Sequence, residues 1–320
     1  MKHLFLLSAV LFITACGSSF SSNSDSVQSG RNEVDEVSST SKPKAPKRQG
    51  WNEIYYPNFY GVDENCPALY GDVASVGVTE YRVKDQYGKV VRDDIQCSKK
   101  YYFNADGNVI GRDDYSLDGL LTCRYICKYN SSGKLIEMAP YDSNGSLGWK
   151  YIYKYDSSGN MVQMSDRSPE GWSEVKYVYK YDSFGNKIVK LDYDMVENCL
   201  IWTSGYKYDE LGNLIEETLT GNGCTSLWGA KAIYKYDSLG HKIEQARYDS
   251  DNSLLKKFIY KYDSSGNMVE EAEYDSSGKV CGKCTYKYDQ KGNVVEQTVY
   301  SGDYLVPKSQ IEFIITYCNK

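Results

Sequence analysis

The sequence predicts an all-β protein built from one repeated β-hairpin. Three observations carry this prediction: a glycine recurs at a nearly fixed period, the residues around it are those of a tight turn, and side chains between the turns alternate with period two. Together they predict an elongated antiparallel β-hairpin array, forming a single coiling sheet, with two strands in each repeat of about 26 residues.

The repeat is a phrase of the form Tyr-x-Tyr-Asp-x-x-Gly-Asn, with small changes from copy to copy. Successive copies are 26 to 28 residues apart, and a degenerate earlier copy ends near Gly88. A period of this size is typical of proteins in which each unit packs mainly on its neighbours. The repeated glycines are Gly107, Gly133, Gly159, Gly185, Gly212, Gly240, Gly266 and Gly292.

The period divides into two shorter turn-to-turn intervals. Gly266, Gly278 and Gly292 are separated by 12 and then 14 residues, and each follows an aspartate. Aspartate can accept backbone hydrogen bonds at the start of a turn, and glycine takes the left-handed conformation that a short hairpin loop needs. About eight residues then remain for each strand, which is a usual strand length. No segment after residue 50 has a helical pattern.

Alternation within the strands predicts two chemically different faces. Tyr151 to Tyr155 and Phe258 to Tyr262 place aromatic residues on one face, and an aliphatic residue followed by lysine on the other. Acidic residues on the intervening strands are expected to pair with these lysines across the strands. The predicted acidic partners include Glu244, Glu270, Glu271 and Glu296.

The first sixteen residues predict export and lipid attachment. Lys2 precedes an apolar run from Leu4 to Ile13, which is too short to span a bilayer and so indicates a signal peptide. The run ends in Ile13-Thr14-Ala15-Cys16, which resembles the lipobox of bacterial lipoproteins. This resemblance implies cleavage before Cys16 and a lipid on its sulfur. Because Gly17 rather than Asp follows, it also implies an outer-membrane lipoprotein, with the periplasmic or surface face left open.

These signals divide the chain into four predicted segments. Residues 1–15 are the signal peptide, and residues 16–50 are the lipidated cysteine with a Ser-rich tether that has too few apolar residues to fold. A tether of this length reaches roughly 30 Å as a random coil. Residues 51–80 are expected to be an N-terminal cap, and residues 81–320 are the repeat domain.

From about residue 81 to 300 the repeat resembles the YD, or RHS-type, repeats of bacterial surface and secreted proteins. The resemblance implies a long coiling antiparallel sheet, whereas the activities of such proteins range from toxin enclosure to adhesion. Lysine stands here where arginine is often found, and no toxin domain is recognised towards Lys320. About eight repeats are also expected to be too few to close a shell, so the sequence does not predict toxin enclosure.

Composition argues against several functional classes. The formal net charge is −6 without a dense basic cluster in the repeats, which argues against nucleic-acid binding. The only histidines are His3 and His241, so histidine catalysis and His-rich metal sites are not expected. Glu216 with Glu217 and Glu270 with Glu271 resemble paired glycosidase acids, but their recurrence favours a solvated sheet face. We expect no enzyme activity, metal or cofactor; the Asp-rich turns leave calcium as a minor alternative.

Ten cysteines are present, and nine remain if Cys16 carries the lipid. In an oxidising compartment disulfides are the default, and we predict a Cys199 to Cys224 bridge between inserted loops. Cys97 and Cys123 occupy equivalent repeat positions about 9.5 Å apart in a meander, too far for a disulfide. Cys281 and Cys284 have the CxxC spacing of redox proteins, which leaves a thiol oxidoreductase as an alternative.

Tryptophans provide the best candidate ligand site. Four of them fall near the second turn of successive repeats and could stack on sugars or contact a protein, although they could also simply cover the sheet. We therefore predict a lipid-anchored envelope protein that acts as a binding or structural module with a glycan or protein partner. The alternative is a hydrolase or thiol oxidoreductase built on the array. The candidate residues are Trp149, Trp172, Trp202 and Trp228.

Overall fold

The computed structural model describes residues 69–222, 229–302 and 304–318. The chain divides into two units, residues 1–43 and 44–320, and every described residue belongs to the second. The prediction of an all-β fold is confirmed: each regular element of the described residues is a strand. The strands are β1 (Val73–Gln86), β2 (Lys89–Phe103), β3 (Val109–Tyr115), β4 (Leu121–Tyr129), β5 (Leu135–Asp142), β6 (Lys150–Tyr155), β7 (Met161–Arg167), β8 (Val175–Tyr181), β9 (Lys187–Asp194), β10 (Cys199–Tyr208), β11 (Leu214–Gly221), β12 (Gly229–Tyr236), β13 (Lys242–Tyr248), β14 (Leu254–Tyr262), β15 (Met268–Asp275), β16 (Val280–Tyr288), β17 (Val294–Ser301) and β18 (Val306–Tyr317).

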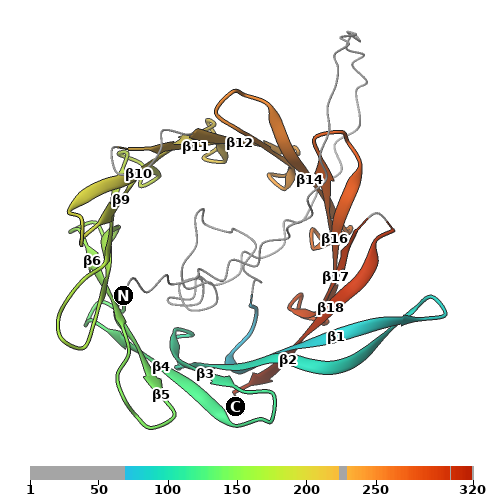
Figure 1. The fold of residues 1–320 in the computed structure, drawn as a ribbon, viewed down its shortest axis with the longest axis horizontal. Coiled ribbons are helices and arrows are strands. Elements are labelled where there is room, and N and C mark those ends of the chain that lie inside the picture. The colour runs from blue at the N-terminus through green and yellow to red at the C-terminus, as the bar shows by residue number, and fades with distance from the viewer. Residues whose placement is uncertain (1–68, 223–228, 303, 319–320) are drawn as a thin grey trace. The chain divides into compact units, whose positions relative to one another are not determined.

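The 18 strands form one closed antiparallel barrel (Figure 1). Each strand pairs with the next along the chain, and β1 also pairs with β18 from Val73 opposite Tyr317 to Arg82 opposite Ser309. The prediction of two strands per repeat is therefore confirmed, but the open coiling sheet was wrong. Twist accumulates from strand to strand until the last strand meets the first, and closure satisfies both edges.

The turns lie at two rims of the barrel. We call the "YD rim" the end where even strands turn into odd strands, at the eight repeated glycines from Gly107 to Gly292. The "second rim" is the opposite end, where odd strands turn into even strands, as at Gly119 and Gly278. Because the strands alternate in direction, β1 begins and β18 ends at the YD rim.

Each YD turn is held by its own side chains. In the β6–β7 turn, Gly159 has φ +84°, a conformation that disfavours other residues. The Asp156 carboxylate accepts the backbone N–H of Asn160 at 2.8 Å and its side-chain amide at 3.2 Å. The Asp and Gly of the repeat are thus explained by turn chemistry, as the sequence predicted.

A tyrosine hydroxyl ties each YD hairpin to the one before it. Tyr155, at the end of β6, donates to the backbone carbonyl of Leu135 at the start of β5, at 2.7 Å. At this rim no turn joins β5 to β6, so the hydrogen bond from Tyr155 provides a link between the two hairpins there. The same contact is made by Tyr181, Tyr208, Tyr236, Tyr262 and Tyr288, at 2.6 to 2.8 Å.

The two faces of the sheet differ as the alternation predicted. We call the side with the first tyrosine of each Tyr-Lys-Tyr the "Tyr face", where Tyr153, Tyr234 and Tyr260 are buried. The opposite "Lys face" carries the intervening lysines. Glu271 was wrongly placed with the Lys-face acids: it lies opposite Tyr260 and accepts a hydrogen bond from Tyr286.

The main apolar core lies on the Tyr face near the barrel closure and the first strands. Its members come from the segment before β1, from β1 to β6, and from β17 and β18. They include the fully buried Tyr101, Leu135 and Met138, together with Phe313. Leu69, just before β1, is also in this core with 3% exposure, so the chain is fixed to the barrel before its first strand.

Only the end of the predicted N-terminal segments lies within the described residues. The signal peptide, Cys16, the tether and residues 51–68 of the predicted cap lie outside the described residues. The rest of that cap, residues 69–80, includes the first part of β1. The part of the chain that the structure describes contains no helix able to span a membrane.

Candidate functional site

The candidate tryptophans occupy different positions at and near the second rim. Trp149 lies just before β6 and Trp172 lies in the β7–β8 loop, with 36% and 71% exposure. Trp202 lies within β10, half-buried, opposite Asp192 and Gly221. Trp228 lies outside the described residues. The structure therefore brings two of the four to successive loops of one rim.

Hydrogen bonds fix the loop that carries Trp172. Asp166, buried at 8% exposure, accepts the backbone N–H groups of Glu174 and Val175, both at 2.9 Å, and the Ser173 hydroxyl at 3.1 Å. At the other end of the loop, the Trp172 N–H donates to the Ser168 hydroxyl at 3.2 Å. A large apolar side chain is thus held in solvent by an ordered loop, which lowers the entropic cost of binding a partner. The contribution of Asp166 was not visible in the sequence because two of its three partners are backbone N–H groups.

A ladder of ion pairs runs along the Lys face. Lys207 contacts Glu216 at 2.6 Å, and Lys287 contacts Glu296 at the same distance, on strands that are neighbours in the sheet. Equivalent pairs join Lys128 to Glu137, Lys235 to Glu244 and Lys261 to Glu270. The prediction of cross-strand partners is confirmed for Glu244, Glu270 and Glu296.

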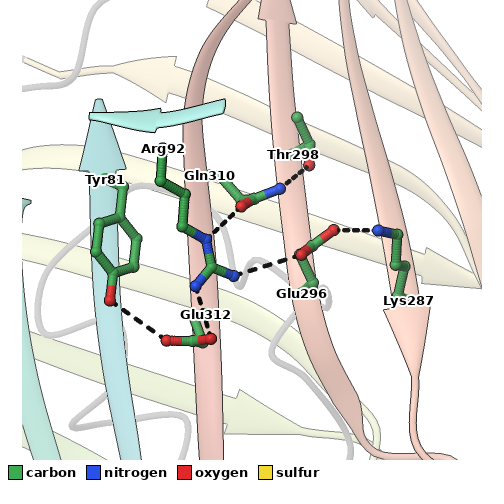
Figure 2. Close-up of polar contacts among 7 residues, drawn as sticks. All are labelled: Tyr81, Arg92, Lys287, Glu296, Thr298, Gln310 and Glu312. Carbon is green, nitrogen blue, oxygen red and sulfur yellow. Dashed lines mark hydrogen bonds and ion pairs between the residues drawn. The ribbon is translucent and has the colours of Figure 1, made fainter. Parts of the chain in front are cut away.

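The ladder becomes a larger network where the barrel closes. Glu296 of β17 lies directly opposite Glu312 of β18, an unfavourable pair of like charges. Arg92 of β2 contacts Glu312 at 2.7 Å and Glu296 at 3.4 Å, and it donates to the Gln310 side chain at 2.5 Å (Figure 2). Arg92 thus compensates both carboxylates and links β2 across β1 to β18 and β17. We interpret this cluster as a structural clamp on the closure.

The Cys281 and Cys284 pair lies within a strand, and neither cysteine is in a disulfide. Burial raises the pKa of the Cys281 thiol, and it raises the pKa of the Cys284 thiol to about 11. Redox thiols need the opposite shift. Cys97 and Cys123 are also free, in β2 and β4 with β3 between them.

Cys199 is disulfide-bonded in the structure. It begins β10, directly after the β9–β10 turn at the second rim. Cys224, its predicted partner, lies outside the described residues, so the Cys199 to Cys224 bridge stays a prediction.

The acidic residues and His241 have structural partners. Glu216 and Glu217 are adjacent on β11 and point to opposite faces: Glu216 pairs with Lys207, and Glu217 accepts the Tyr234 hydroxyl at 3.0 Å. His241 lies 2.9 Å from Asp237 in its turn and stacks on Tyr262. Within residues 69–222, 229–302 and 304–318, no group of three His, Cys, Asp or Glu residues could hold a metal ion.

Comparisons with known proteins report structural likeness only. No protein-family model and no curated protein matches the chain. Among solved structures, a porin-like protein from Bacteroides uniformis matches with 11% identity and a TM-score of 0.43, covering 78% of this chain and 100% of that one. A porin-like protein from Bacteroides vulgatus matches with 13% identity and a TM-score of 0.42, again covering 78% of this chain and 100% of that one.

TcdB2-TccC3 is a third structural match, with 12% identity and a TM-score of 0.32 over 72% of this chain. The chain spans only 15% of the length of that protein. We therefore base the function on the chain's own residues.

Proposed function

We propose that the protein is a lipid-anchored module of the bacterial cell envelope that binds a glycan at the second rim of its barrel. One observation carries the proposal: Trp172 is 71% exposed on a loop that Asp166 holds in place. An indole presented in this way offers a flat apolar surface to the face of a sugar ring. Trp149, in the preceding second-rim loop, extends the same surface.

The barrel supports this function as a scaffold. Its strands are all paired, and its turns are closed by their own side chains, so the second-rim loops are carried on a rigid frame. Lipidation at Cys16, suggested by the lipobox-like sequence, would hold this frame at the outer membrane.

A glycan array tests the binding site. The chain from Gly17 onward, which contains every described residue, should bind a subset of glycans. Trp172→Ala should weaken that binding by about tenfold or more, as expected for a central aromatic contact. Leu120→Ala is the matched control, because Leu120 is 66% exposed at the same rim but is not an aromatic platform. Equal affinity of Trp172→Ala and the parent would contradict the proposal.

A second experiment tests the anchor. Cys16→Ser should prevent lipidation and move the protein out of the membrane fraction after a carbonate wash. Retention of this variant in that fraction would show that another segment provides the attachment. This result is independent of glycan binding, so either part of the proposal can fail alone.

A further inference from the structure

Three successive turns of the YD rim carry an exposed apolar residue at the same position. The residue before the turn glycine is Phe184, Leu211 and Leu239 in the β8–β9, β10–β11 and β12–β13 turns, with 89%, 86% and 64% exposure. In the other five YD turns the position is polar. Those residues are Asp106, Ser132, Ser158, Ser265 and Lys291.

The turn itself does not require an apolar residue there. Leu211 uses only its backbone N–H, which donates to Asp209 at 3.0 Å, and Ser265 makes the same bond to Asp263 at 2.9 Å. The side chain at this position is thus free to serve another purpose. Since the three turns join alternate strands, their tips are about 9.5 Å apart and form a row along the rim.

Two lysines beside this row form no ion pair with the described residues, and they mark a break in the Lys-face ladder. Lys154 of β6 lies opposite Gln163, and Lys180 of β8 lies opposite Val189, where other repeats have glutamate. Both lysines are exposed. The nearby Asp156 and Asp182 carboxylates each accept backbone hydrogen bonds within their own turns.

A groove joins the lysine break to the apolar row. It lies between the β6–β7 and β8–β9 turns, has a volume of about 550 Å³, and is lined by Asp156, Asn160, Lys180, Asp182 and Phe184, among others. A row of apolar tips with exposed lysines beside it has the features of a surface that contacts lipid: the tips enter the acyl boundary, and the lysines meet the phosphates.

We propose that the YD rim over β8–β13 docks on a phospholipid bilayer, with Phe184, Leu211 and Leu239 inserted and Lys154 and Lys180 at the headgroups. The position of β1 is compatible with this orientation, because the described chain enters the barrel at the YD rim, and a tether from Cys16 would not have to pass the second rim. The second rim, with Trp149 and Trp172, then faces away. Only the orientation rests on the proposed anchor; the docking surface stands on the side chains themselves.

Vesicle sedimentation tests the docking surface without the anchor. The chain from Gly17 onward is mixed with vesicles of phosphatidylethanolamine and phosphatidylglycerol, or of phosphatidylcholine alone. The parent should bind the first, and the triple variant Phe184→Ser, Leu211→Ser, Leu239→Ser should bind about tenfold more weakly. Serine occupies this position in three other turns, so the variant should keep the parent circular-dichroism spectrum. Leu117→Ser with Leu120→Ser, on exposed residues of the second rim, is the matched control and should bind as the parent does.

The lysines give a separate prediction. Lys154→Gln with Lys180→Gln should lower binding to vesicles containing phosphatidylglycerol but not to phosphatidylcholine vesicles, and added salt should remove the difference. The proposal is overturned if the parent does not sediment with either vesicle, if the triple serine variant binds like the parent, or if the second-rim control loses as much binding. Soluble glycans are absent from this assay, so its failure is distinguishable from failure of the glycan-binding proposal.

Discussion

The Tyr face is packed differently on two arcs of the same barrel. On the first arc, from β2 to β7, the tyrosines meet apolar residues: Met138 lies opposite Tyr151 and is 1% exposed, and Met164 lies opposite Tyr153. On the second arc, from β10 to β17, equivalent positions are polar. Tyr234 donates to Glu217, and Tyr260 hydrogen-bonds to the Gln245 side chain at 3.0 Å.

One lysine reinforces the polar packing of the second arc. At the start of β13, Lys242 places its ammonium 5.8 Å from the Tyr234 ring and 4.7 Å from the Tyr260 ring. The equivalent residue at the start of β5 is Leu135, which is fully buried. The comparison shows that one hairpin template accepts either apolar or hydrogen-bonded packing against its tyrosines. The repeat therefore specifies the hairpins, while the residues opposite the tyrosines specify the lining.

The largest effect is expected from Met138→Ala on the first arc. Met138 is 1% exposed, so its truncation should lower the free energy of unfolding by about 2–5 kcal/mol, the range for buried large-to-small changes. Met268→Ala is the matched control, because Met268 begins β15 on the second arc and is half-buried. Chemical denaturation of both variants measures the difference. Equal losses would mean that the two arcs are packed alike.

A smaller effect is expected from converting one arc into the other. Tyr260→Phe should cost about 1 kcal/mol, since it leaves the Gln245 amide without its partner. Adding Gln245→Met replaces the polar pair with an apolar Phe–Met pair like the apolar packing of the first arc, and the double variant should regain most of the loss. Stability measured over this double-mutant cycle decides the matter: additive losses would show that the hydrogen bond does not hold the second arc together.

Acid should affect the turns of both arcs in the same way. Backbone hydrogen bonding from Asn160 lowers the pKa of Asp156, and side-chain hydrogen bonding from Asn213 lowers that of Asp209. A carboxyl with a depressed folded-state pKa stabilises the fold above its unfolded pKa of about 3.9, and this contribution is lost as the pH falls through the folded-state value. The midpoint temperature of thermal unfolding should therefore decrease as the pH is lowered below about 4.

Asparagine variants test whether the difference between the arcs is confined to the residues opposite the tyrosines or also involves the turns. Asp156→Asn on the first arc and Asp209→Asn on the second should each reduce the steepness of this acid dependence by a similar amount. Thermal unfolding at a series of pH values provides the measurement. A response confined to one arc would place the difference between the arcs in the turns as well.

The smallest effect is expected on the Lys face, where each arc carries exposed lysine–glutamate pairs of the same kind. Lys128 and Lys261 are 60% and 64% exposed in their pairs with Glu137 and Glu270. Exposed pairs of this kind contribute little and are screened by salt. Lys128→Gln and Lys261→Gln should shift the denaturation midpoint less than any variant above, and the shift should vanish in high salt. A large shift at either position would show that the ladder, not the Tyr face, holds that arc.

Local features of the fold were predictable from the sequence, and closure was not. The Asp and Gly of each turn are explained by interactions within the same five-residue turn. The alternation of Tyr and Lys follows from strand geometry alone. Closure depends on β1 and β18, whose residues lack the YD phrase and pair across more than 200 positions of the chain. Nothing local in Val73 to Gln86 marks it as the partner of the last strand.

The tryptophan site was likewise predictable in part. Trp149 and Trp172 were found from their place after the second turn, and the structure puts both in second-rim loops. Trp202 was placed in the same group, but the β9–β10 turn is short, so Trp202 falls inside β10 instead. The Arg92 cluster was missed because its members come from three separate strands and share no motif.

Closure also makes the number of repeats a dimension of the molecule. In an open array, gain of one repeat would lengthen the protein and leave every other unit in place. In a ring, one more hairpin adds two strands to the circumference, widening the barrel by roughly 3 Å and relaxing the curvature of all its neighbours. Repeat duplication during evolution would therefore change the barrel diameter in fixed increments. At every diameter, Arg92 would have to contact the same acidic residues for the barrel to close in the same way.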